Sequence, residues 1–282
     1  MLWTPHNEFS WKLNNWGATL TGAAMGDVIT AHASTAHTKG TAVSIFAGAA
    51  VIADVYEVHL VFNTPSVAAT RFFADLLVDP AGGTSWSVLI ANIAINTPSF
   101  AMNGAQYYFP IYIKAGSSIG MQVSCSTANI NVRAMVSISG KPSRPDLVQA
   151  GSVVETIGAV TATTVGTAFT SGAGTVGSYS GALGTTVRDC WFWQLGILID
   201  DASQTANAYV IELAAGDETN KHVIGNGFLH TEPSTTETAG KSPFPLDGMP
   251  YHRVPKGASL YVRSAHNGTV DSNTSAVAYG VA

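Results

Sequence analysis

The chain has 282 residues, of which 46% are hydrophobic and only 11% charged, and its formal net charge is −5. The charged fraction is less than half of the roughly 25% usual in globular proteins, which favours a chain that packs against other chains over a solitary cytosolic enzyme. Thirteen scattered Lys and Arg residues disfavour a nucleic-acid partner, because phosphate binding needs clustered basic side chains. The sequence has no run of 18 apolar residues and no cationic, apolar leader, so we expect neither membrane insertion nor secretion.

Residues 1–25 are predicted to form an N-terminal arm ahead of the first domain. Trp3, Trp11 and Trp16 stand there among polar residues, and the second half of the chain has no similar stretch. Two interpretations stay open: an arm that docks onto another protein, and a segment that folds back onto its own domain. The three tryptophans are candidate interaction residues, whereas the lone basic residue Lys12 argues against a genome-binding arm.

Residues 26–140 are predicted to form a first β domain. Runs of four to eight residues rich in Val, Ile, Tyr, Phe and Thr alternate apolar and polar positions, and clusters of Gly, Pro, Asn and Asp separate them. This pattern is typical of strands joined by turns. Residues 68–78 would also fit a helix, but we expect a strand because the matching stretch at 207–213 is strand-like.

The second half of the chain repeats the pattern of the first. With a shift of 135 residues, 56–99 lies over 191–234 without a gap, and the Pro-Ser pair of INTPSF recurs in HTEPST. Farther downstream the shift becomes 141, so that 114–119 matches 255–260. This indicates a tandem duplication.

The duplication predicts an all-β chain of two tandem jelly-roll-like β-sandwich domains. The polar, Pro-containing segment 141–150 is the expected linker, and 151–282 is the expected second domain. Upstream, Gly26–Ile29 resembles 151–154, and Gly40-Thr41 resembles Gly166-Thr167. The Gly/Ser/Thr-rich stretch 170–186 is interpreted as an insertion without a counterpart in the first copy.

Side chains that could carry chemistry do not form a recognisable pattern. His32 and His37 would lie on opposite faces of a strand, and the acidic pairs Asp200-Asp201 and Asp217-Glu218 fall at predicted turns, where acids are usually solvated. We therefore predict no catalytic, cofactor-binding or metal-binding residues, and a protein that is not an enzyme. Cys125 and Cys190 are expected to be buried free thiols.

Two further positions allow alternative interpretations. Glu57 and His59 share a strand face, most simply a solvated one. Trp191 and Trp193 are placed on one face of a strand, where they would serve a core, an interface with a partner, or a sugar ring stacked on them.

This combination of features resembles the accessory structural proteins of tailed-phage virions: head decoration proteins, head fibres and tail-associated jelly-roll modules. The resemblance rests on the combination of domain organisation and composition and not on a diagnostic motif, so no functional residue is carried over. It implies a virion protein made in the host cytoplasm, which binds other capsid or tail proteins and forms a homo-oligomer, with a trimer favoured.

Two other classes stay open. A receptor- or carbohydrate-binding module would present an aromatic patch around Trp86, Trp191 or Trp193 and bind a glycan receptor. A glycan-active enzyme would need two carboxylates close together in one cleft, and the sequence offers no convincing pair.

Overall fold

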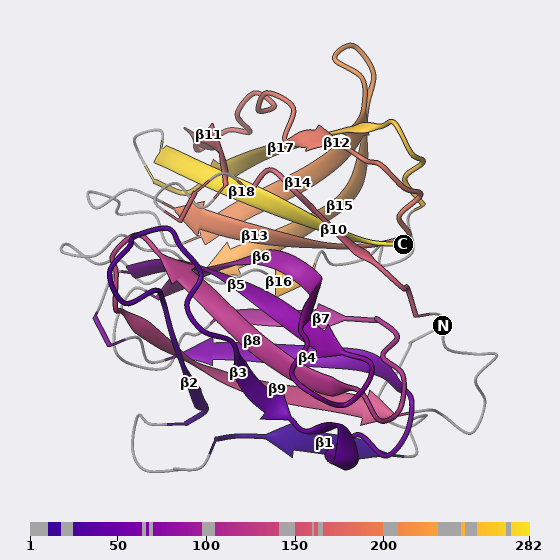
Figure 1. The fold of residues 1–282 in the computed structure, drawn as a ribbon. Helices are drawn as coiled ribbons and strands as arrows, with labels where there is room; N and C mark the ends of the chain where they lie inside the picture. The colour runs from indigo at the N-terminus through magenta and orange to yellow at the C-terminus, as the bar shows by residue number, and fades with distance from the viewer. Residues whose placement is uncertain are drawn as a thin grey trace.

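The computed structural model describes residues 11–17, 25–63, 66–67, 70–97, 105–140, 150–159, 161–162, 166–199, 208–230, 244–245, 253–268 and 272–282. Within these ranges the chain is all-β, apart from one short 3-10 turn at Gly48–Ala50. Figure 1 shows two β-sandwiches, one formed by the first half of the chain and one by the second. Trp3 and residues 141–149 of the predicted linker lie outside the described residues, and the predicted domain boundaries stay predictions.

The first sandwich has the strand order of a jelly roll. One sheet runs β2-β9-β4-β7, with β1 also paired to β9, and the other runs β3-β8-β5-β6. The strands are β1 (Lys12–Asn15), β2 (Asp27–Thr30), β3 (Val43–Phe46), β4 (Val55–Asn63), β5 (Thr70–Asp79), β6 (Ser87–Thr97), β7 (Gln106–Phe109), β8 (Ser118–Cys125) and β9 (Asn131–Gly140).

The second sandwich follows the same path. Its sheets run β11-β18-β13-β16, with β10 also paired to β18, and β12-β17-β14-β15, and a short parallel pairing of β11 with β17 joins them. The prediction of two tandem jelly rolls is therefore confirmed. The strands are β10 (Val154–Ile157), β11 (Thr167–Ala173), β12 (Gly184–Thr185), β13 (Phe192–Ile199), β14 (Ala208–Gly216), β15 (Lys221–His230), β16 (Phe244–Pro245), β17 (Ser259–His266) and β18 (Ser272–Val281).

The N-terminal strand β1 resolves one of the open alternatives. Lys12–Asn15 pairs with Ser139–Val136 of β9, so this part of the predicted arm folds back onto its own domain. In the second domain, β10 pairs with the corresponding end of β18. The strand therefore has a counterpart that the sequence comparison missed when it matched Gly26–Ile29 with 151–154.

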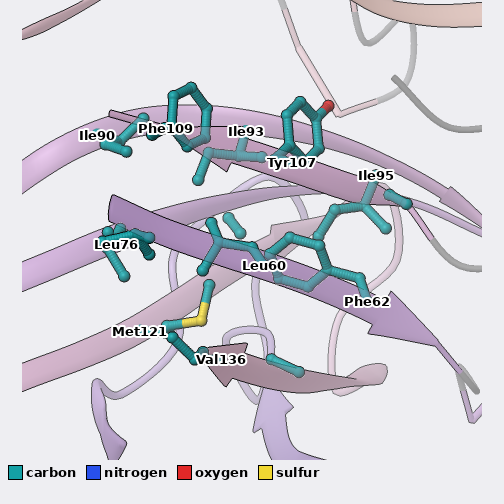
Figure 2. Packing of buried hydrophobic residues seen from close by; sticks show 14 of the residues in the cluster. Leu60, Phe62, Leu76, Ile90, Ile93, Ile95, Tyr107, Phe109, Met121 and Val136 are labelled. Atoms are coloured by element: carbon teal, nitrogen blue, oxygen red, sulfur yellow. The ribbon is translucent and has the colours of Figure 1, made fainter. Parts of the chain in front are cut away.

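Alternating apolar residues from both sheets fill the first core. Figure 2 shows Leu60 and Phe62 of β4 and Val136 of β9 facing Leu76 of β5 and Met121 of β8. Residues of β4 alternate between this buried face and a more exposed one, as expected for a sheet that covers a core on one side. The alternation of residues along each strand thus gives each sheet one apolar face, and the two apolar faces pack together as a sandwich.

The sheet of the second domain that contains β13 and β18 is buried on both faces. Trp193, Leu195 and Ile197 of β13 point into the core of the second domain. Phe192 and Leu198 of the same strand, together with Val277, Tyr279 and Val281 of β18, belong to the buried cluster of the first domain. Because strands β10 and β13 also contact β6, as Figure 1 shows, the two jelly rolls share a continuous apolar junction.

A buried polar network crosses this junction. The Tyr279 hydroxyl donates to the Asn92 carbonyl (3.0 Å) and accepts from the Ala94 amide (2.7 Å), while the Tyr107 hydroxyl donates to the Ala94 carbonyl (2.5 Å). Asn92 has a left-handed backbone (φ 52°) where the pairing of β5 with β6 shifts register. This bulge frees backbone groups of β6 from the ladder, and Tyr279 of the second domain binds them.

Tyr279→Phe should destabilise the protein by about 2 kcal/mol, because it leaves the Asn92 carbonyl and the Ala94 amide buried without the hydroxyl. Urea unfolding followed by tryptophan fluorescence would measure the change. Tyr56→Phe, which removes a hydroxyl from a half-exposed tyrosine outside the junction, should stay within about 0.5 kcal/mol. Equal losses for the two variants would contradict the role given to Tyr279.

Candidate functional site

The N-terminal tryptophans have two different environments. Trp11 is partly buried against the first core, and its carbonyl accepts a hydrogen bond from the Gly140 amide (2.7 Å). Trp16 is 54% exposed, and so are Met25 (44%) and Val28 (41%) nearby. The Gly26 amide donates to the Trp16 carbonyl (2.6 Å), which brings the two segments together. We name Trp16, Met25 and Val28 the edge patch, since they lie where β1 and β2 complete one side of the sheet.

Trp191 and Trp193 do not form a shared aromatic platform. Trp193 is 3% exposed in the second core, whereas Trp191 precedes β13, is half-buried and packs against the first core. Its ring meets Phe192 edge-on at 6.1 Å, and Phe192 in turn meets Tyr108 at 5.9 Å. Trp193 therefore fills the core and has no surface for a partner, while Trp191 belongs to the junction.

Glu57 corrects the expectation of a solvated strand face. Glu57 is only 4% exposed, because it lies in a row with Ser139 of β9 and Lys12 of β1. Strand β7 lies on its other side. Burial raises the pKa of the Glu57 carboxyl from 4.5 to about 7, and Lys12 and the Tyr108 hydroxyl counteract this rise only partly. Its Oε2 atom accepts no hydrogen bond from the described residues.

Among the remaining sequence candidates, the prediction that His32 and His37 lie on a strand is wrong, because both lie in the loop between β2 and β3. Asp217 caps the hairpin between β14 and β15 by accepting the amides of Thr219 (2.8 Å) and Asn220 (2.6 Å), which confirms the predicted turn. Asp200 and Asp201 lie outside the described residues. Cys125 and Cys190 are buried free thiols, as predicted. In the described ranges no three His, Cys, Asp or Glu side chains gather as a metal site, and no helix could span a membrane.

The segment predicted as an insertion has a counterpart in the first domain. In the second domain the amides of Gly174 and Gly177 donate to the carbonyls of His266 (2.8 Å) and Ser264 (3.0 Å) of β17. In the first, the amides of His37 and Gly40 donate to Cys125 (2.8 Å) and Val123 (2.9 Å) of β8, the matching positions at the shift of 141. Every third residue of the segment bonds to β17 in this way, since the amides of Ser180 and Leu183 also donate to carbonyls of that strand. In the first domain, the pairing of β3 with β8 lies at the matching positions. The sequence comparison missed this because Gly40-Thr41 corresponds to Gly177-Ser178 and not to Gly166-Thr167.

An aromatic and cationic cluster holds this segment on the second domain. The Arg263 guanidinium lies over the Tyr179 ring at 4.4 Å and forms an ion pair with Glu212 of the neighbouring strand. Lys221 lies over the Tyr261 ring at 4.5 Å and near the Tyr179 ring at 5.8 Å. These contacts fix Tyr179 against the sheet.

No protein-family model and no curated protein matches the chain. Among solved structures, PNGase F, a glycosylasparaginase from Flavobacterium meningosepticum, is 9% identical over 96% of both chains with a TM-score of 0.38. The CBM22-1–CBM22-2 tandem domain of Xyn10C from Paenibacillus barcinonensis is 10% identical over 89% of this chain and 85% of that one (TM-score 0.27). A Sulfolobus Turreted Icosahedral Virus chain is 10% identical over 90% and 59% (TM-score 0.22).

The chain is a two-domain β-sandwich protein. Its likenesses to these structures are distant ones of fold, and none of them carries an argument about activity, substrate or partner.

Proposed function

We propose that the chain is a non-enzymatic structural protein of a tailed-phage virion, a capsid decoration protein, minor capsid protein or other accessory protein. The edge patch is the observation that carries this proposal. Three large apolar side chains stay exposed beside the outermost strands of a sheet, and such open edges with exposed apolar residues are where other chains add.

The patch fits a second copy of this chain as its first partner. The low charge of the sequence reduces repulsion between identical surfaces, and a sheet edge can be used repeatedly around a symmetry axis. The apolar junction supports the same role, because a block of two fused domains keeps its shape when neighbours bind to it. A trimer is the expected assembly, which then binds other capsid or tail proteins of the particle.

The absolute mass of the purified protein, measured by light scattering over a concentration series, tests this proposal. The wild-type chain should form a trimer or a larger closed assembly. Trp16→Ser combined with Met25→Ser should weaken association roughly thirtyfold or more, since a buried aromatic anchor contributes about 2 kcal/mol or more.

Val176→Ser combined with Val187→Ser is the matched control, because both valines are exposed on the second domain, far in sequence from the edge patch. This variant should keep the mass of the wild type. A monomeric wild type at every concentration, or an unchanged mass for the Trp16 and Met25 variant, would contradict the proposal.

A further inference from the structure

Each jelly roll contains a hollow at the same place in its fold. In the first domain it lies between β2 and the segment that runs along β8. In the second domain it lies between β11 and the segment that runs along β17. Its volume is about 340 Å³ in the first domain and about 310 Å³ in the second. Thr30, Gly40 and Thr41 line the first hollow, and the second is lined at corresponding positions by Thr170, Gly177 and Ser178.

The correspondence follows from strand register. Thr30 comes directly after the inward-facing Ile29 and pairs with Asn131 of β9, whereas Thr170 comes directly after the inward-facing Phe169 and pairs with Asn273 of β18. Gly40 and Gly177 make the equivalent hydrogen bonds to β8 and β17 described above. The residues that follow them, Thr41 and Ser178, are both exposed hydroxyl residues.

A backbone requirement explains the two glycines. A Cβ on Gly40 would clash with the Thr30 carbonyl oxygen, and a Cβ on Gly177 would lie 3.0 Å from the Thr170 carbonyl oxygen. The glycines therefore let the two segments approach each other closely beside the hollow. No such requirement explains the hydroxyls, since Thr30, Thr41, Thr170 and Ser178 form no side-chain hydrogen bond with the described residues.

The chemistry of the lining selects a class of ligand. Neither hollow is lined by Lys, Arg, Asp or Glu among the described residues, so a charged ligand has no carboxylate, ammonium or guanidinium group of opposite charge to pair with there. Each instead combines hydroxyls with one partly exposed ring, and the second is also lined by the buried Phe169. In the first domain the ring is His32, whose Nδ1 accepts the amide of Thr35 (3.1 Å), and in the second it is Tyr179, held by Arg263.

We propose that the two hollows are twin binding sites for neutral sugar units. Hydroxyl groups that donate and accept hydrogen bonds suit the hydroxyls of a sugar, and a ring supplies an apolar surface with a polar edge. The volumes lie at the small end for ligand sites, which fits one or two sugar rings in each. This inference goes beyond the structural role proposed above and does not depend on it, since a virion protein of any oligomeric state could carry such sites.

Gly181→Leu and Ala33→Leu are the variants that block the hollows. Gly181 lines the second hollow, its φ is not left-handed, and an added Cβ would meet no atom within 4 Å. Ala33 lines the first hollow and is exposed. Gly181→Leu therefore adds a side chain in open space, and Ala33→Leu enlarges a side chain that is already exposed, so neither disturbs the core. Ala50→Leu, on the exposed 3-10 turn outside both hollows, is the matched control.

The test is saturation-transfer NMR on the full chain, titrated with D-glucose, D-galactose, N-acetyl-D-glucosamine and their disaccharides. At least one of these sugars should bind saturably, the Gly181→Leu, Ala33→Leu double variant should bind it roughly tenfold or more weakly, and Ala50→Leu should bind it as the wild type does. Thermal unfolding should give the same midpoint for all three proteins. The proposal is overturned if none of the sugars binds saturably, or if the double variant binds as tightly as the wild type.

Discussion

Replacing Asp75 with alanine is expected to destabilise the protein by about 3 kcal/mol. The carboxylate is buried in the middle of β5 and bonds to groups from three other parts of the first domain. Its Oδ1 accepts from Lys39 Nζ (2.7 Å) and the Asn92 amide (2.8 Å), and its Oδ2 accepts from Gln122 Nε2 (2.8 Å). Removing one member of a buried ion pair leaves the other charge uncompensated, which costs about 3–5 kcal/mol.

The lower end of that range applies because the Lys39 side chain keeps 23% exposure and can recover part of its hydration. Burial already lowers the pKa of Lys39, and the contact with Asp75 counteracts this. Urea unfolding at neutral pH measures the loss. The matched control is Arg253→Ala, which breaks the exposed pair with Asp189 and should change stability by less than about 1 kcal/mol.

Asp75 should also affect the junction between the domains. Its bond to the Asn92 amide holds the bulge that presents the Asn92 carbonyl to Tyr279. In a double-mutant cycle, the stability lost by the variant with both Asp75→Ala and Tyr279→Phe should therefore be smaller than the sum of the two separate losses. The difference should be about 0.5 kcal/mol or more. Strict additivity would show that the bulge stays in place without the carboxylate.

The sequence predicted the long central strands well. An alternating pattern determines which residues face a core, and the shift of 135 correctly matched β4 with β13, since Leu60 and Phe62 occupy the core positions of Leu195 and Ile197. Short outer strands were harder. β1 and β10 have only four residues each, too few for a periodic signal, and their place is fixed by pairing with strands more than 100 residues away.

The candidate sites were less predictable for a similar reason. The burial of Glu57 depends on β1, β7 and β9 together, so a sequence pattern that covers β4 alone cannot show it. The twin hollows left a faint signal, a glycine followed by a hydroxyl residue, but several such pairs occur in a chain with 28 glycines. Only the hydrogen bonds to β8 and β17 identify which pairs correspond.

The buried Glu57 should make the protein less stable at alkaline pH than at mildly acidic pH. Because burial raises the pKa of its carboxyl from 4.5 to about 7, the folded state binds a proton between these values that the unfolded state releases. The free energy of unfolding therefore falls as the pH rises from about 4.5 through 7. A shift of this size corresponds to roughly 3 kcal/mol for a group that is almost fully buried.

Glu57→Gln should remove most of this dependence, because an amide has the shape of the protonated acid and carries no charge at any of these pH values. The variant should match the wild type near pH 4 and exceed its stability by roughly 3 kcal/mol near pH 8. Lys12 and His59 on the same sheet face and the neighbouring Tyr108 are present in both proteins, so the comparison isolates the Glu57 carboxyl together with its contacts to Lys12 and Tyr108. Glu218→Gln, at an exposed turn, is the control that should keep the wild-type profile. Parallel profiles of wild type and Glu57→Gln would mean that water or another group stabilises the ionised carboxylate in the folded protein, and that the sheet face formed with β1 is open enough to admit it.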